Sequence, residues 1–147
     1  MAFAPRLTLD ETRSLLAGLL SGTDRLRVES VDDAGVVCIA PPEGLELRPG
    51  VGLSGPAIFW AVDVTGCLAV NAVVGWTPAI VLAHADISFL TPASPGPLRI
   101  GAEVLHLAGR SAVVTARAHD HRDSLVAAAT MHFPLPSRAT RGIVPEA

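Results

Sequence analysis

The chain has 147 residues, half of them hydrophobic and 17% charged, which is enough to bury one core and gives no sign of a second domain. Its net charge of −3 and its eleven scattered basic residues, all arginines, exclude a basic stripe of the kind that binds nucleic acid. The high hydrophobic content favours a buried interface between subunits.

The start of the chain predicts a helix. Residues 9–20 place leucines at helical spacing, Thr8 or Asp10 can cap the first turn, and Gly22 ends the pattern. No basic segment followed by a hydrophobic one opens the chain, so a secretory signal is not expected. We therefore expect a cytoplasmic protein, and the heavy use of Ala, Gly, Pro, Val and Arg indicates a bacterial source with GC-rich genes.

Six later segments are rich in β-branched or alternating hydrophobic residues and are bounded by turn sequences such as DDAG, PASPGP, AGR and HRD. These predicted strands are residues 25–31, 36–40, 79–90, 98–107, 111–120 and 125–135. We expect the first two to form a hairpin and the last four to be joined by short antiparallel connections.

A long hydrophobic segment, residues 56–75, separates the two groups of strands. Pro and Gly clusters precede it, and proline suits the first turn of a helix, so the helix should start at Gly55–Pro56 and end near Gly75. The segment has the ~20 residues needed to span a bilayer. An internal charge, Asp63, and the lack of flanking arginines favour instead a buried helix of a soluble protein, without a membrane.

The order of elements predicts an α+β fold in which one long central helix is wrapped by an antiparallel β-sheet, with a further helix at the N-terminus. Residues 1–135 form a single domain in this interpretation. Residues 136–147 lack hydrophobic periodicity and are predicted to be a loose tail.

Asp63 is the only acidic or basic residue within the hydrophobic segment. A carboxylate beside residues such as Phe59 and Trp60 loses hydration, so it is tolerated only when it is paired, protonated or used in chemistry. The alternative is a structural carboxylate, bonded to a Thr or Arg, that holds a subunit interface in register. From these residues alone both interpretations stay open.

Metal and cofactor chemistry have little support in the sequence. Cys38 and Cys67 lie in hydrophobic segments without CxxC spacing, so buried free thiols are expected. The segment HDHRD, residues 119–123, resembles a metal-binding cluster but has no evident third ligand, and we interpret it as a solvated hairpin. The GxSxG and P-loop motifs are absent, and neither a metal nor a cofactor is predicted.

Four segments together carry a family resemblance: LSGPAIFWAVDVTGCLA, DISFLTPASPGPL, LAGRSAVVTARAHD and LVAAATMHF. From Leu45 to Phe133 the chain resembles the PaaI-like hotdog-fold acyl-CoA thioesterases. In that family the central helix begins at an HGG signature, and a catalytic Asp follows nine residues after the His; Ser54 and Asp63 stand at these two positions. The resemblance implies hydrolysis of an acyl-CoA without a cofactor, by a homodimer or homotetramer whose sites lie between subunits.

Asp63 and Gly55 are the catalytic candidates that this resemblance implies. The Gly55 N–H, at the positive end of the helix, is suited to bind the thioester carbonyl and the oxyanion that develops on it. Asp63, two to three turns further on, is suited to act as general base or nucleophile. Pro56 lacks an N–H, which leaves Ala57 as the only further donor to consider. For Gly55 the alternative is a glycine chosen for close packing.

The chain departs from the family pattern at several positions. Ser54 replaces the signature His, Arg48 replaces a common Asn, and Leu82 replaces a Thr or Ser that reaches the partner's site. His84 shares a strand face with Leu82 and is a candidate for orienting water or binding substrate in the partner's site, or else a structural histidine. Arg110, in a GR turn, is a candidate for pairing with CoA phosphates, or else an exposed turn arginine.

Two other functions remain open. The combined loss of the family's His, Asn and Thr favours a non-catalytic protein that binds acyl-CoA or lipid on the same fold. A dehydratase expects a His paired with an acid on the helix, and no His occurs between Met1 and Ile80. The pocket wall is expected to suit a hydrophobic acyl group and to include Ile58, Phe59, Trp60 and Trp76.

Overall fold

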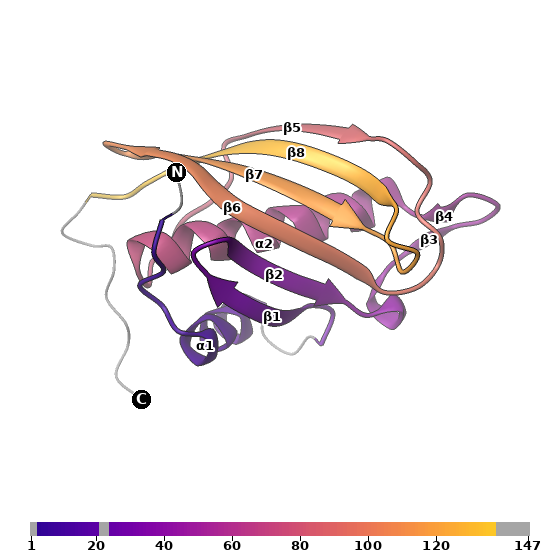
Figure 1. The fold of residues 1–147 in the computed structure, drawn as a ribbon, viewed down its shortest axis with the longest axis horizontal. Coiled ribbons are helices and arrows are strands. Elements are labelled where there is room, and N and C mark those ends of the chain that lie inside the picture. The colour runs from indigo at the N-terminus through magenta and orange to yellow at the C-terminus, as the bar shows by residue number, and fades with distance from the viewer. Residues whose placement is uncertain (1–2, 21–23, 138–147) are drawn as a thin grey trace.

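One long helix lies against one face of a curved sheet in a computed structural model that describes residues 3–20 and 24–137 (Figure 1). The long helix is α2 (Gly55–Val74), and a shorter helix, α1 (Leu9–Leu19), packs beside the first strand and against α2. This confirms the predicted α+β fold with a long central helix, an antiparallel sheet and an N-terminal helix. The predicted tail falls mostly on residues 138–147, which lie outside the described residues, and the domain boundary after residue 135 stays a prediction.

The sheet has six strands in the order β1-β2-β6-β7-β8-β5, and every neighbouring pair is antiparallel. Their bounds are β1 (Arg27–Asp32), β2 (Gly35–Ala40), β5 (His84–Phe89), β6 (Leu98–Ala108), β7 (Ser111–His119) and β8 (Leu125–Pro134). A short 3-10 helix, η1 (Pro42–Gly44), and a small separate hairpin, β3 (Leu47–Arg48) with β4 (Gly52–Leu53), lead into α2.

The connection between β5 and β6 differs from the simple succession of strands that the sequence predicts. β5 pairs with β8, so residues 90–97 carry the chain past the ends of β8 and β7 before β6 begins. The physical reason is that β2 and β7 already occupy both sides of β6, so β5 cannot pair with it and lies instead at the edge of β8. β5 itself starts only at His84, and its outer edge has no neighbour among the described strands.

α1 begins where the sequence predicts. Thr8 is the residue that caps it: its side chain accepts the Glu11 N–H, and the Glu11 side chain accepts the Thr8 N–H in return. Leu15 and Leu16 are buried by this helix. Gly22, the predicted end, lies outside the described residues.

α2 runs almost over its predicted range and ends at Gly75, whose φ of 98° suits glycine. It is long and hydrophobic enough to cross a membrane by length and composition. However, it packs along β2, β6, β7 and β8, and most of it is buried inside the protein. At Gly66 the helix packs tightly against β8, because a methyl group there would lie 2.6 Å from Met131 Cε. α2 is therefore the core helix of the fold.

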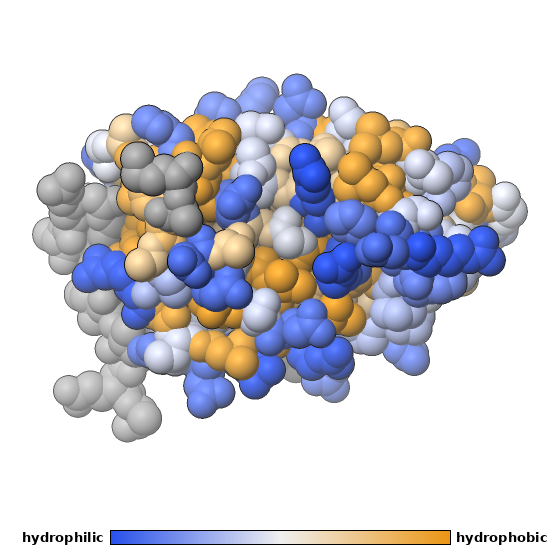
Figure 2. Space-filling view, in the orientation of Figure 1, coloured by the Kyte–Doolittle hydropathy of each residue, from blue (hydrophilic) through white to orange (hydrophobic). Residues whose placement is uncertain are grey.

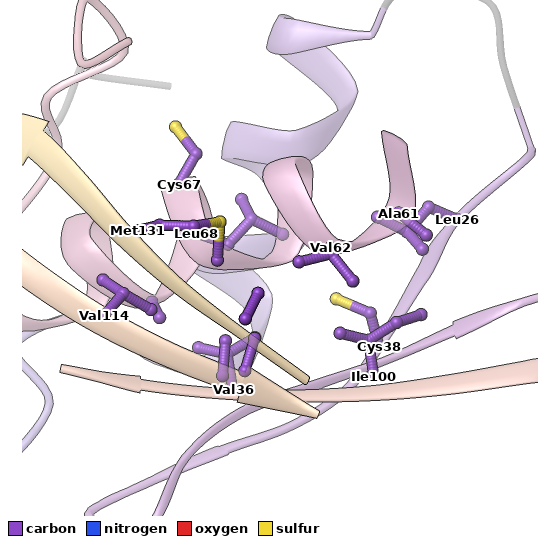
Figure 3. Close-up of a cluster of buried hydrophobic side chains, with 14 of the residues drawn as sticks. Leu26, Val36, Cys38, Ala61, Val62, Cys67, Leu68, Ile100, Val114 and Met131 are labelled. Carbon is purple, nitrogen blue, oxygen red and sulfur yellow. The ribbon is translucent and has the colours of Figure 1, made fainter. Parts of the chain in front are cut away.

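The core fills the space between α2 and the sheet (Figure 3). Val62 and Leu68 point from α2 toward Ile100 and Val114 of the sheet, whereas Cys67 points away from the strands. Both cysteines are buried and free, as predicted, and burial raises the pKa of Cys38 to about 12 and that of Cys67 to about 11. Neither thiol is ionised near neutral pH.

Candidate active site

The N-terminus of α2 presents one unsatisfied backbone donor. Ser54 is buried and caps the helix, its Oγ accepting the Ala57 N–H at 3.1 Å. Pro56 has no N–H, and the Gly55 N–H has no acceptor among the described residues. Ala57 is therefore removed as a second donor by the Ser54 cap, and Gly55 is left as the only free N–H of this turn. Ser54 itself has a structural explanation.

A cavity of about 360 Å³ lies beside Gly55. Its lining is almost entirely hydrophobic, and Arg48 is its only charged member: Arg48, Val51, Leu53, Gly55, Ile58, Phe89, Leu90, Thr91, Pro92 and Ala93. Figure 2 shows hydrophobic surface at the end of the molecule that carries β3 and β4. Exposed hydrophobic side chains that border a concave site are typical of a binding surface.

The predicted pocket wall is only partly right. Ile58 lines the cavity, but Phe59, Trp60 and Trp76 are not among its lining residues. Trp60 instead lies beneath the Arg25 guanidinium, 4.2 Å from its ring centroid. The residue that sequence reasoning missed is Phe89, whose ring is the nearest group to the open side of Gly55. No local sequence pattern identifies Phe89. Its place beside Gly55 depends on how the end of β5 lies relative to the start of α2, which only the fold reveals.

The β3–β4 hairpin is fixed against the loop that follows β5. Leu53 donates its N–H to the Ala93 carbonyl at 3.0 Å, and Ser54 donates its N–H to the Glu46 carbonyl at 2.9 Å. Gly52 has a φ of 133°, and any side chain there would overlap the Ala93 carbonyl oxygen. Glycine is thus required at Gly52 for this wall of the cavity to close.

Asp120 holds the same loop from its other end. Its carboxylate accepts backbone N–H groups from Ser94 at 3.1 Å, Arg122 at 3.0 Å and Ser124 at 3.1 Å. Burial acts to raise the pKa of Asp120, but the three N–H donors outweigh it and hold that pKa below the usual range. The HDHRD segment is therefore a turn organised by a buried acid, not a wholly solvated hairpin. Within the described residues no group of three potential ligands could hold a metal ion.

Asp63 is half-buried on α2, one turn before Cys67. Cys67 points away from the sheet and contacts the Ile80 carbonyl at 3.6 Å, so Asp63 lies on the side of α2 that faces the segment leading to β5. Burial raises the pKa of Asp63. The carboxylate forms no hydrogen bond or ion pair with any described residue, so the Thr or Arg partner of the structural interpretation is not found among residues 3–20 and 24–137.

Asp63 and Gly55 lie apart along the helix. Eight residues separate them in α2, which corresponds to about 12 Å at a rise of 1.5 Å per residue. Asp63 is not among the residues that line the cavity. Within one chain the Gly55 N–H and the Asp63 carboxylate therefore lie on the same helix, but they are not positioned to act on the same substrate carbonyl.

The remaining predicted residues lie away from the cavity. Leu82 is half-buried against the core just before β5. His84 is exposed on the sheet face opposite α2, where its ring meets His132 edge-on at 5.5 Å. Arg110 is exposed at the β6–β7 turn, at the other end of the sheet, and its Nε donates to the Leu135 carbonyl at 3.2 Å. Of the predicted catalytic and substrate-site residues, only Gly55 lines the cavity, and Ser54 precedes it as the helix cap.

Comparisons with known proteins agree with the fold. The family model described as thioesterase superfamily matches residues 53–127, and no curated protein sequence matches the chain. A thioesterase from Haemophilus influenzae superposes with a TM-score of 0.73 at 15% identity, over 91% of this chain and 94% of that one. The E. coli PaaI protein from the phenylacetic acid degradation operon gives 0.72 at 16% identity, over 89% and 97%. Zebra fish thioesterase superfamily member 2 gives 0.75 at 22% identity, over 88% and 99%.

Proposed function

Because the chain belongs to the thioesterase superfamily and has the PaaI-like hotdog fold, thioester hydrolysis is its reaction class, and we propose that its substrate is an acyl-CoA. In this proposal the Gly55 N–H binds the thioester carbonyl, and Asp63 is the general base or nucleophile. The single observation that carries it is the free Gly55 N–H, which lies at the start of a 20-residue helix and beside a hydrophobic cavity.

The proposed chemistry follows from where charge develops. If Asp63 acts as base, it takes a proton from water while the hydroxide adds to the carbonyl carbon. The oxyanion that forms is stabilised by the Gly55 N–H and by the positive end of α2. The intermediate then collapses, the carbon–sulfur bond breaks, and the CoA thiolate takes up a proton. The raised pKa of Asp63 makes its carboxylate a stronger base than an ordinary aspartate.

A second copy of the chain is part of this proposal. β5 leaves a free edge, and hydrophobic side chains next to it are exposed, including Val81 at 70%, Phe89 at 52% and Leu90 at 53%. Antiparallel pairing of two β5 strands would place the start of one strand, with Leu82 and His84, beside the end of the other. The free edge of β5 and the exposed hydrophobic side chains beside it support a homodimer or homotetramer in which Asp63 of one copy acts at the cavity of the other.

The proposal is tested by thiol release from a panel of acyl-CoA thioesters. We expect the purified protein to release free CoA, and Asp63→Asn to lose this activity because the amide is neither a base nor a nucleophile. Asp33→Asn is the matched control, since Asp33 is an exposed turn aspartate with no partner among the described residues. Turnover retained by Asp63→Asn would remove Asp63 from the mechanism.

A second candidate, a non-catalytic acyl-CoA or lipid binder, is supported by a different observation. The Ser54 hydroxyl is engaged in capping, so the first turn of α2 offers the cavity only the Gly55 N–H, and the polar side chains of the lining are those of Arg48 and Thr91. This function predicts thermal stabilisation by acyl-CoA with no thiol release across the panel. In either case the burial of α2 supports a soluble protein, in keeping with the cytoplasmic location that the sequence predicts.

A further inference from the structure

We infer that Arg48 makes the cavity selective for substrates that carry a second anionic group, besides the developing oxyanion. The inference rests on the proposed function for the place where the thioester binds. Its test measures binding and needs no turnover, so the two can fail separately.

Arg48 has no internal partner. It is exposed at the end of β3, lines the cavity, and forms no ion pair or hydrogen bond through its side chain with any described residue. Glu46, the nearest acid in sequence, is not paired with it, and no Asp or Glu lines the cavity. A guanidinium beside hydrophobic walls, without an acid to neutralise it, attracts an anion from outside the chain.

The position of Arg48 is set by the backbone around it. In the β3–β4 hairpin Arg48 pairs with Gly52, which has no side chain to cover the guanidinium on the shared face. Gly52 is in turn held against the Ala93 carbonyl, and Val51 donates its N–H to the Arg48 carbonyl at 3.0 Å. Arg48 therefore starts from a fixed hairpin, which reduces the entropy lost when it binds an anion.

The chemistry of the cavity defines the ligand. Hydrophobic walls from Val51, Leu53 and Ile58 suit an alkyl or aryl chain, and one guanidinium at the same cavity suits a carboxylate or phosphate, which it can bind through two N–H groups. Two parts of an acyl-CoA can supply such a group. One is a carboxylate at the far end of the acyl chain, and the other is a phosphate of the carrier.

Four non-hydrolysable ligands separate these sources: an S-alkyl-CoA thioether, its counterpart of equal length with a terminal carboxylate, and the pantetheine thioethers of both, which lack phosphate. Binding is measured by calorimetry for the wild type, Arg48→Gln and Arg48→Lys. The control is Arg27→Gln, because Arg27 is exposed on β1 at the opposite edge of the sheet. Thermal unfolding of each variant shows that it is folded.

An acyl carboxylate partner predicts that the wild type binds the carboxylated ligands about tenfold more tightly on either carrier, a difference typical of a charge-assisted hydrogen bond. A phosphate partner predicts a similar preference for the CoA ligands over the pantetheine ligands. In either case Arg48→Gln loses the preference, whereas Arg48→Lys keeps part of it and Arg27→Gln keeps all of it.

The inference is overturned if Arg48→Gln keeps the wild-type preference, or if the wild type shows no preference or binds none of the four ligands. A wild type that shows the preference yet releases no thiol from any acyl-CoA would retain Arg48 as a selectivity residue and reject the proposed hydrolysis.

Discussion

The two halves of α2 differ in whether their polar groups have hydrogen-bond partners. In the C-terminal half, Asn71 is buried, donates to the Cys67 carbonyl at 2.9 Å and accepts the Thr77 N–H at 2.6 Å. In the N-terminal half, the Gly55 N–H and the Asp63 carboxylate have no partner among the described residues. Polar groups with complete hydrogen bonds stabilise the fold, whereas the Gly55 N–H, which has no partner among the described residues and lies beside the cavity, is available to a ligand.

The largest effect on stability is expected in the C-terminal half. Asn71→Ala removes the acceptor of the buried Thr77 N–H and the side-chain bond to the Cys67 carbonyl, which should cost about 2–4 kcal/mol of unfolding free energy. Urea denaturation measures it, with the exposed Thr130→Ala of β8 as control. A loss of less than about 0.5 kcal/mol would mean that this network is dispensable, and the contrast between the halves would fail.

In the N-terminal half of α2, removing the charge of Asp63 is expected to stabilise the protein, by an amount that depends on pH. Since the folded state raises the pKa of Asp63, the stability associated with its protonated form is present below the ordinary aspartate pKa of about 3.9 and is lost as pH rises through the raised value. Asp63→Asn, which is neutral at every pH, should therefore raise the melting temperature more at about pH 8 than at about pH 4. A shift that is equal at both, or larger in acid, would contradict it.

The smallest stability effect is expected at Arg48. Because the Arg48 side chain is exposed and has no partner among the described residues, Arg48→Gln should change the unfolding free energy by less than about 0.5 kcal/mol. The comparison is Asp120→Ala, which removes three backbone hydrogen bonds to a buried carboxylate and should destabilise the fold clearly. If Arg48→Gln cost as much as Asp120→Ala, Arg48 would have a structural role.

Local signals in the sequence were enough to predict α2 and its start. Pro and Gly residues act within a few positions of the chain, so the position of Gly55 at the first turn followed directly, whereas the Ser54 cap was not predicted. The place of β5 could not be predicted in the same way, because it depends on which strand edge remains free after the other pairings form.

Long-range contacts limited the prediction of the site. The sequence placed Asp120 in an exposed turn. Its burial could not be predicted, because one of its hydrogen bonds reaches Ser94, 26 residues away. In the sequence Arg48 was identified only as a departure from the family's Asn. Its place at the cavity depends on the β3–β4 hairpin, which the sequence did not predict. Asp63 was singled out by its charge and its catalytic role stays a prediction; its separation from Gly55 follows from the rise of the helix, and in the proposed function a second copy completes the site.

The most direct test of the central claim compares Gly55→Pro with Gly55→Ala. Proline removes the N–H and is tolerated in a first helical turn, and Ser54, with φ −71° and ψ 150°, already has the extended conformation required before a proline. Alanine keeps the N–H, and its methyl group would lie 3.7 Å from the Phe89 ring, an ordinary contact. Both substitutions add a Cβ before Pro56, whose ring disfavours the helical conformation of the preceding residue, so Gly55→Ala controls for this steric cost.

Thiol release from the best acyl-CoA substrate is measured for both variants. We predict that Gly55→Ala keeps most of the turnover and that Gly55→Pro loses about 10²–10³-fold in kcat, as expected for an oxyanion donor. Equal activity in the two variants would contradict the assignment of the Gly55 N–H to the reaction.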